Sequence, residues 1–508
     1  MTKASGNKTI ADLLYSSNLN KEAIVVPGFN TMSYGDLLHQ VQSLKDDLVC
    51  LGITKADRIA VVLPNSIEFV VTFLAVSALA TVAPLNPLYK SGELEFYIKD
   101  INAKTLITTK QSGGELDQLD IDGLTKVTVS MEAHGRVVLE GPSRIQESSI
   151  SDANETIQGD VALILHTSGT TSKPKRVPLS HTNLISSINH IIDTYSLSDR
   201  DVSLCVMPLF HVHGLVASTL STLISGGTLI LPGRFNIATF WRTVREYNVT
   251  WFSAVPTIHQ ALIGRMWQKK ESFRPNALRF IRSCSASLAN QTMIDMEQLL
   301  EVPVLEAYGM TEAAHQMTSN PLPPDRRMIG SVGKATGLSV GIMDDRGTFI
   351  ATGSPGEIVI KGPNVIAGYE GNSEANVTSF SSGWFRTGDQ GILDEDGYLT
   401  ITGRIKEFIN RSGEKISPKE IDEILLQYPG VKEAVAFGLP NDVHGEVPAA
   451  AVVAYDGIRE SDLIQHCRNH MAIFKCPRKI YIVSSIPKTP TGKIQRRIVA
   501  SKIKELYK

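Results

Sequence analysis

Short runs of β-branched and other apolar residues recur along the first 330 residues, separated by longer amphipathic stretches. They occupy residues 59–63, 81–85, 105–109, 127–130, 162–166, 202–207, 228–231, 251–254, 280–283 and 304–307. Strands that alternate with crossover helices form parallel sheets with helices on their faces. We therefore expect a large N-terminal α/β region built on parallel sheets.

The most apolar stretch covers residues 69–83 and lies between Pro64 and Pro84. A membrane-spanning helix needs about 20 apolar residues. The stretch is too short for that, so it predicts a buried helix and no membrane span.

The pattern changes beyond Gly330, where short alternating segments are dense in glycine. Such segments indicate antiparallel strands with tight turns. After Ser417 helices and strands mix again, with helices predicted over 418–427 and near 496–505 and strands near Val435 and Ala450. We predict an N-terminal domain over residues 1–403, including a small β-barrel-like part at 321–403, and a small α+β C-terminal domain over 404–508.

The bulk composition narrows the functional classes. The chain of 508 residues exceeds what one core supports, so two or more domains are expected. Lys plus Arg number 50 against 52 Asp plus Glu, and this balance gives no support for electrostatic binding to nucleic acid or anionic membrane.

Five dispersed cysteines indicate free thiols in a reducing compartment. The chain shows neither a signal peptide nor an SKL-type ending, so we expect a cytosolic protein, with peroxisomal delivery as the alternative. The oligomeric state stays open.

The sharpest local feature follows the apolar run that ends at Leu165. Four hydroxyl side chains flank one glycine and lysines follow, in the order Thr167, Ser168, Gly169, Thr170, Thr171 and Lys175. Glycine lets backbone N–H groups approach closely, while hydroxyl and ammonium groups cradle phosphate oxygens. The spacing is not that of a Walker A loop. Taken alone, the segment indicates either a phosphate loop or a Ser/Thr-rich turn.

Four further segments resolve that choice. They are the sequences at residues 308–312 (Tyr-Gly-Met-Thr-Glu), 384–389 (Trp-Phe-Arg-Thr-Gly-Asp), 403–407 (Gly-Arg-Ile-Lys-Glu) and 487–494 (Pro-Lys-Thr-Pro-Thr-Gly-Lys-Ile). In this order and spacing, the five motifs resemble those of the acyl-activating, adenylate-forming superfamily. That superfamily includes acyl- and aryl-CoA synthetases, firefly luciferase and peptide-synthetase adenylation domains. The resemblance runs from about residue 31 to 500.

The resemblance implies an ATP site. Residues 167–175 match the family loop that holds the β- and γ-phosphates, and Thr311 matches the α-phosphate contact. Tyr308 and Ser285 match the residues on either side of adenine. Asp389 matches the acceptor of hydrogen bonds from the ribose hydroxyls, and Arg404 matches a residue near ribose and phosphate. The same ATP-binding set includes Ala286, Glu306, Ala307, Gly309 and Lys175.

The resemblance also implies the catalytic groups. Lys493 bridges the carboxylate and the α-phosphate, Glu312 is the Mg²⁺ ligand, and Thr311 and His211 complete the catalytic set. Lys406 matches a hinge, and Ser412, Gly413, Glu414 and Lys415 match the loop that lines the coenzyme A (CoA) tunnel. The C-terminal domain is expected to be mobile, because it rotates between the two half-reactions. ATP, Mg²⁺ and CoA are the implied cofactors and co-substrates.

The chain departs from many relatives at two positions. Arg176 and Ser412 stand where glycine is common. Neither position supplies an essential side chain in the family, so the departures put only loop mobility in doubt.

The choice of carboxylic acid lies between the motifs. His213, Ser285 and His315 lie on segments that supply polar donors where a long-chain enzyme needs an apolar tunnel. This pattern resembles the oxalate–CoA ligase branch of fungi and plants, which implies conversion of oxalate, CoA and ATP to oxalyl-CoA, AMP and diphosphate. A ligase for another short-chain or aromatic acid is the alternative. Two other classes stay open: a catalytically inactive nucleotide-binding regulator, and an ADP-forming kinase or synthetase.

Overall fold

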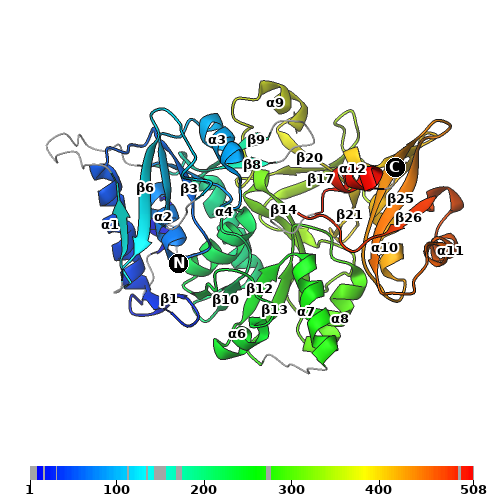
Figure 1. Cartoon of the computed structure of the whole chain (residues 1–508), viewed down its shortest axis with the longest axis horizontal. Coiled ribbons are helices and arrows are strands. Elements are labelled where there is room, and N and C mark those ends of the chain that lie inside the picture. Colours follow the sequence, from blue (N-terminus) through cyan, green and yellow to red (C-terminus); the bar gives the residue numbers. More distant parts are fainter. Residues whose placement is uncertain are drawn as a thin grey trace.

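The computed structural model describes residues 8–14, 18–29, 31–110, 114–132, 135–141, 156–167, 174–269, 276–489 and 494–506. Two large sheets and a small one lie in the N-terminal part, and a fourth sheet lies at the C-terminal end, drawn in orange and red in Figure 1.

The first large sheet has seven strands in the order β7-β6-β5-β3-β4-β8-β9. The strands are β3 (Arg58–Val62), β4 (Thr81–Pro84), β5 (Thr105–Thr109), β6 (Thr125–Met131), β7 (Val137–Glu140), β8 (Val161–Thr167) and β9 (Lys175–Ser180). The helices along this segment are α1 (Tyr34–Cys50), α2 (Ile67–Ser77) and α3 (Ser91–Asp100). Strands β3 to β6 and β8 pair in parallel, whereas β7 and β9 are antiparallel to their neighbours.

The second large sheet has nine strands in the order β16-β15-β14-β13-β12-β10-β11-β1-β2. They are β1 (Glu22–Val25), β2 (Thr31–Ser33), β10 (Val202–Cys205), β11 (Thr228–Ile230), β12 (Trp251–Ala254), β13 (Phe280–Ser283), β14 (Val304–Met310), β15 (His315–Ser319) and β16 (Lys334–Ala335). The helices along it are α4 (His181–Tyr195), a π-helix (His213–Leu220), α5 (Ser221–Ile224), α6 (Phe240–Glu246), α7 (Pro256–Lys269) and α8 (Asn290–Leu300). Strands β10 to β14 pair in parallel, as the sequence predicts.

The glycine-dense region forms an antiparallel sheet of five strands. They are β17 (Ser339–Met343), β18 (Gly356–Lys361), β19 (Phe380–Ser381), β20 (Trp384–Leu393) and β21 (Leu399–Arg404), with α9 (Ser373–Ser379) beside them. Strand β20 is the longest and pairs with β18, β19 and β21. It therefore carries the predicted ribose residue, Asp389, in the middle of this sheet.

The C-terminal part is an α+β unit around a second five-stranded sheet. Its elements are β22 (Ile409–Arg411), β23 (Glu414–Ile416), α10 (Pro418–Leu426), β24 (Val431–Asn441), β25 (Gly445–Ala454), α11 (Glu460–His470), β26 (Lys479–Ile482) and α12 (Arg496–Leu506). It contacts the small sheet where Ser417 and Lys419 donate hydrogen bonds to the backbone oxygens of Thr402 and Ile401, at 2.5 and 2.8 Å.

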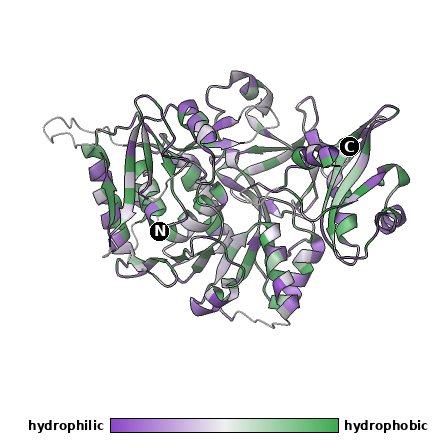
Figure 2. Cartoon of the chain, viewed as in Figure 1, coloured by the Kyte–Doolittle hydropathy of each residue, from purple (hydrophilic) through white to green (hydrophobic). Residues whose placement is uncertain are grey.

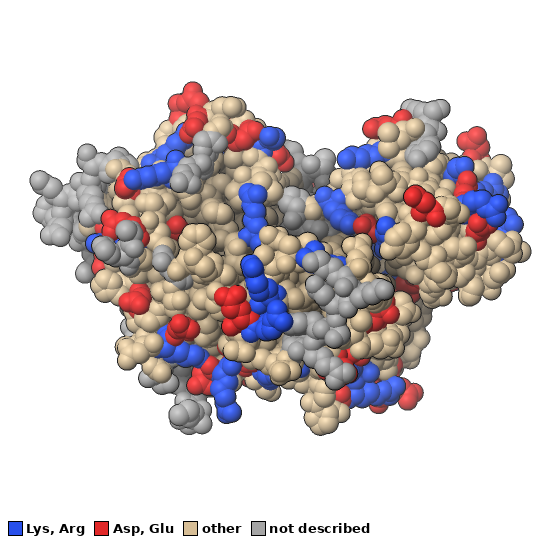
Figure 3. All heavy atoms as spheres, turned by 60° about the horizontal axis from the view of Figure 1, so that its bottom comes forward, with Lys and Arg blue, Asp and Glu red and all other residues tan. Residues whose placement is uncertain are grey.

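Apolar side chains concentrate on the strands and on the helix faces that cover them (Figure 2). The prediction of one buried helix over residues 69–83 is wrong in its last part, because the helix ends at Ser77 and the residues from Thr81 form the buried strand β4, as the apolar run at 81–85 predicts. None of the helices in the described ranges is both long and apolar enough to cross a membrane. On the face drawn in Figure 3, Lys and Arg lie among Asp and Glu.

Candidate active site

The predicted site residues meet at the carboxyl ends of β12, β13 and β14, where ligands bind in open parallel sheets. Ser253 of β12 and Arg282 of β13 are register partners, so their side chains point to the same face. His213 opens the π-helix, and Ser285 follows β13. Polar side chains from distant parts of the sequence therefore converge at one edge of the sheet.

His213 forms the centre of the first cluster. Its Nδ1 lies 2.9 Å from Ser285 Oγ, and its Nε2 lies 2.6 Å from Ser253 Oγ. His213 and Ser253 are fully buried, whereas Ser285 is half-buried with a backbone φ of 75°. The cluster is therefore exposed to solvent at Ser285. Gly214 permits this packing, because a Cβ there would lie 2.3 Å from the backbone oxygen of Pro208.

His315 lies beside His213, and the two rings stack with centroids 5.1 Å apart. His315 follows the tight turn between β14 and β15 and has a φ of 116°, while Ala314 before it has a φ of 49°. Gly309 makes the turn possible, since a Cβ there would lie 1.8 Å from the backbone oxygen of His315. The structure therefore brings together the three residues predicted to bind the acid, His213, Ser285 and His315.

Arg282 lies behind these histidines and is fully buried. Its guanidinium donates to Tyr195 Oη at 2.8 Å and to Ser253 Oγ at 2.9 Å. It also contacts His315 Nε2 at 3.0 Å and Gln316 Oε1 at 3.1 Å. The sequence analysis did not single out Arg282, Tyr195, Ser253 or Gln316.

A second cluster surrounds Asp389. Tyr308 donates a hydrogen bond to Asp389 Oδ2 at 2.5 Å, and Arg404 Nε donates to Asp389 Oδ1 at 3.1 Å. Burial and the neighbouring Asp389 carboxylate raise the pKa of Tyr308, which keeps its hydroxyl a donor. The Asp389 carboxylate raises the pKa of Arg404. The cluster places an aromatic ring, a carboxylate and a guanidinium within one site, as ribose and adenine recognition requires.

Glu312 lies in the short helical turn Thr311–Ala313 and is 6% exposed. Tyr369 donates to Glu312 Oε1 at 2.9 Å, and the Lys175 ammonium lies 4.3 Å from the centre of the Tyr369 ring. Burial lowers the pKa of Lys175, an effect that Glu312 opposes and Lys406 reinforces. Tyr369 is a further residue that the sequence analysis did not single out.

Glu312 fits a magnesium ligand by its chemistry. Mg²⁺ is commonly held by one or two carboxylates together with substrate phosphates and waters. Among the described residues, no three His, Cys, Asp or Glu side chains gather as a metal site. One buried carboxylate beside a lysine suits an ion that arrives with the nucleotide.

Glu306 supports the turn that carries Ser285. Its Oε1 accepts from the backbone N–H of Leu288 at 2.9 Å. Glu306 is 4% exposed, and burial raises its pKa from 4.5 to about 7. In the same strand, β14, Ala307 and Gly309 stand on either side of Tyr308.

The hydroxyl-rich loop is described only at its two ends. Thr167 and Lys175 are register partners on β8 and β9, so the loop closes an antiparallel hairpin. Ser168, Gly169, Thr170 and Thr171 lie outside the described residues, as does Lys493.

Arg176 fixes the base of this loop. It contacts Asp100 at 3.1 Å and Glu370 at 3.2 Å. Glu370 also pairs with Arg58 at 2.7 Å, and Asp100 with His166 at 2.9 Å. The arginine that replaces the common glycine therefore joins a charge network.

The remaining predicted residues are His211, Lys406 and the segment 412–415. His211 Nδ1 accepts from the backbone N–H of His213 at 3.2 Å, at the start of the π-helix. Lys406 lies in the helical turn Ile405–Glu407, after Arg404. Ser412 has a φ of 51° and contacts His444 Nδ1 at 2.9 Å, and Gly413, Glu414 and Lys415 continue into β23.

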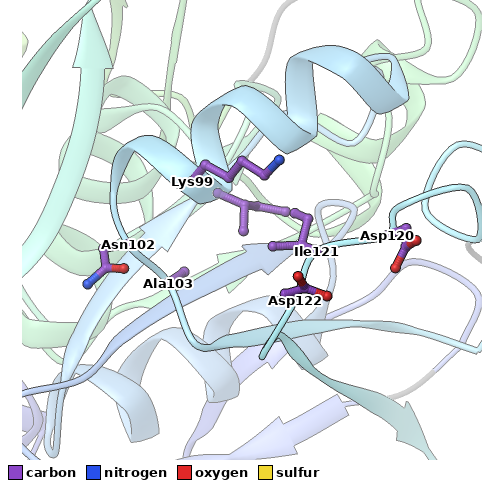
Figure 4. Close-up of a pocket in the computed structure, with 7 residues that line it drawn as sticks. Lys99, Asn102, Ala103, Asp120, Ile121 and Asp122 are labelled. Carbon is purple, nitrogen blue, oxygen red and sulfur yellow. The ribbon is translucent and has the colours of Figure 1, made fainter.

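A separate hollow of about 400 Å³ lies between the end of α3 and the loop before β6 (Figure 4). Lys99, Asn102, Asp120 and Asp122 are among its lining residues. None of the predicted site residues lines it, so it is not part of the candidate site.

Family models match most of the chain. The model described as AMP-binding enzyme matches residues 15–370, and the model described as AMP-binding enzyme C-terminal domain matches residues 420–493.

Curated relatives and a solved structure extend this similarity. The chain is 44% identical to an oxalate–CoA ligase of Arabidopsis thaliana, covering 95% of each chain, and 42% identical to one of Saccharomyces cerevisiae, covering 94% of each. The structure of ATP-bound MatB from Rhodopseudomonas palustris superposes with a TM-score of 0.89 at 30% identity, covering 99% of this chain and all of that one.

Proposed function

The chain belongs to the AMP-binding enzyme family, and from that premise we propose that it joins oxalate to CoA through an oxalyl-adenylate. The products are oxalyl-CoA, AMP and diphosphate, and ATP, Mg²⁺ and CoA are required. The relatives that are 42–44% identical over nearly the whole chain are oxalate–CoA ligases, which supports the assignment.

The observation that carries the choice of oxalate is the cluster at Ser285. Two buried histidines stack beside a half-buried hydroxyl at the edge of the sheet. Burying a second carboxylate without donors is prohibitively costly, so a diacid enzyme needs such groups within the acid pocket. A fatty acid needs the opposite, an apolar channel.

The proposed mechanism assigns the two clusters to the two reactants. Tyr308, Asp389 and Arg404 bind the nucleoside, and Lys175 receives the phosphates at the end of the hydroxyl-rich loop. Ser285 and the histidines hold the acid so that its free carboxylate oxygen faces the α-phosphorus. Glu312 would hold Mg²⁺, and that ion supplies neutralisation of phosphate charge when bound. Alignment of two bound reactants removes much of the entropic barrier.

We also propose that the C-terminal domain, residues 404–508, rotates between the half-reactions about Lys406. Lys493→Ala is expected to abolish adenylate formation and to spare thioester formation from supplied oxalyl-adenylate. Lys406→Pro is expected to do the reverse, because proline fixes φ and removes an N–H. Equal losses of both half-reactions in each variant would contradict the rotation.

The test of the function is product identification. Purified protein is incubated with ATP, Mg²⁺, CoA and one acid at a time: oxalate, malonate, acetate or octanoate. We expect AMP and oxalyl-CoA, with oxalate used most efficiently. ADP would indicate a different reaction class, absence of turnover with all acids would favour a nucleotide-binding regulator, and preference for another acid would reassign the substrate.

We propose a reducing compartment, the cytosol or the peroxisome. All five cysteines are free thiols, four of them buried. Cell fractionation with markers for both compartments tests the location.

A further inference from the structure

Arg282 carries a buried positive charge with no acidic counterpart. Arginine stays protonated in proteins, so this charge is permanent. Its hydrogen-bond partners Tyr195, Ser253, His315 and Gln316 carry no negative charge, and Cys284 also contacts it. No carboxylate forms an ion pair with Arg282 in the part of the chain that the structure describes.

Glu306 on the neighbouring strand β14 and Asp201 before β10 do not supply the counter-charge. Glu306 is the register partner of Ser283, which follows Arg282, so it points to the opposite face of the sheet. Asp201 pairs with Arg279. A buried ion without a partner is strongly disfavoured unless something compensates it. The bound acid is the anion that the site lacks.

Arg282 also determines where His315 carries its hydrogen. A guanidinium only donates hydrogen bonds, so His315 Nε2, at 3.0 Å, must accept. An accepting nitrogen carries no hydrogen. His315 is therefore neutral, with its hydrogen on Nδ1.

The same reasoning reaches His213 through Ser253. Ser253 Oγ accepts from Arg282, and the acceptor within reach of its own hydroxyl hydrogen is His213 Nε2 at 2.6 Å. If His213 carried a hydrogen on Nε2, the buried Ser253 hydroxyl would have no acceptor among the described residues, at the full desolvation cost. His213 is therefore neutral with its hydrogen on Nδ1, which donates to Ser285 Oγ at 2.9 Å.

The hydrogen bonds then all point in one direction. Arg282 donates to Ser253, Ser253 donates to His213, and His213 donates to Ser285. The first three members are fully buried and the last is half-buried. Ser285 accepts from His213, so its hydroxyl hydrogen points away from the cluster toward the acid. Each member of such a chain polarises the next.

We propose that Arg282 is a positioning and specificity residue. It fixes His213 and His315 as neutral Nδ1–H donors and holds a permanent positive charge behind them, which favours an acid with a second, ionised carboxylate. The inference rests on the proposed function for its substrate, a small dicarboxylate. The hydrogen positions on the histidines do not depend on it.

Substrate discrimination is the first test. Oxamate has the shape of oxalate with a neutral amide in place of one carboxylate. We expect Arg282→Met to lower kcat/KM for oxalate about 100-fold and to change that for oxamate less than threefold. Arg282→Lys keeps the charge and is expected to retain most of the preference for oxalate. Equal losses with both acids in Arg282→Met, or no loss with oxalate, would overturn the proposal.

The second test does not depend on an Arg282 variant. Nitrogen-15 NMR of the full-length wild-type chain labelled at histidine reports the tautomers, and His213→Gln and His315→Gln assign the two signals. We expect both rings to be neutral with hydrogen on Nδ1. A hydrogen on Nε2 of either ring would overturn the proposal. If wild type uses oxalate no better than acetate, the proposed function fails, while the tautomer result still decides the role of Arg282.

Discussion

The two halves of the site treat charge in opposite ways. In the nucleotide half each cation lies near an acid. Arg404 forms an ion pair with Asp389, and burial lowers the pKa of Lys175 while the charge of Glu312 opposes that lowering. In the acid half Arg282 is buried among neutral groups. The first half is therefore nearly balanced before substrate arrives, whereas the second half lacks one negative charge.

The difference indicates what each half recognises. Carboxylates accept hydrogen bonds from hydroxyl groups and bind Mg²⁺, which are the roles proposed for Asp389 and Glu312. A buried cation with ordered donors suits an anion that must leave water. Complementary charge gives specificity more than raw affinity. Variants in the nucleotide half should therefore affect all acids equally, and variants in the acid half should change the choice of acid.

The largest effect is expected in the nucleotide half. Glu312→Gln should lower kcat about 10²- to 10³-fold with every acid that the enzyme accepts, because one electrostatic contributor to phosphoryl chemistry is lost. The preference among acids should not change. AMP release at saturating ATP measures this. Glu374→Gln, at an exposed position of α9, is the control. A loss confined to oxalate would contradict the division into halves.

The acid half should show the reverse pattern. His213→Ala and His315→Ala are each expected to lower kcat/KM for oxalate about 10- to 100-fold, since the first removes the hydrogen bond that orients Ser285 and the second removes a buried donor beside it. The KM for ATP should stay within about twofold of that of the wild type. His39→Ala, exposed on α1, is the matched control. Intact oxalate turnover in both variants would remove the histidines from the pocket.

A smaller effect is expected on stability, at Glu306 between the two halves. Its folded pKa of about 7 lies above the unfolded value of 4.5, so the folded state binds more protons between these pH values. Stability therefore falls as pH rises through this window and levels off above it. Glu306→Gln avoids the ionisation and keeps an acceptor for Leu288. The variant should match the wild type near pH 4 and exceed it by about 3 kcal/mol at pH 8. Denaturant unfolding at both pH values measures this, and a constant difference would contradict it.

The smallest effect is expected at Arg176. Its partners keep other contacts when it is removed, since Glu370 still pairs with Arg58 and Asp100 with His166. Arg176→Ala should lower the free energy of unfolding by about 1 kcal/mol or less and raise the KM for ATP only slightly. Arg200→Ala, in an exposed turn, is the control. A large loss of ATP binding would show that this network positions the phosphate loop itself.

The sequence predicts the sheets well because parallel strands are buried on both faces and stand out as β-branched runs. The same property explains the error at residues 69–83. A buried helix and a buried strand are equally apolar, so hydrophobicity does not reveal that the helix ends at Ser77, although the run at 81–85 does predict the strand that begins at Thr81.

The residues proposed to bind the nucleotide can be singled out in the sequence because they lie within short motifs. Arg282 could not be singled out in this way, because a charged residue in the strand segment Phe280–Ser283 gives no sign that it is buried. Its environment depends on Tyr195 and Gln316, which are distant in the chain. Tyr369 is hidden for the same reason, since its contact with Glu312 spans 57 residues.

The central claim is that this protein activates oxalate as an adenylate, and exchange of labelled diphosphate into ATP without CoA measures that step alone. The account predicts exchange that depends on oxalate and is at least about 100-fold more efficient than with acetate, because acetate leaves the buried donors unpaired. Absence of oxalate-dependent exchange, or equal exchange with acetate, would contradict it.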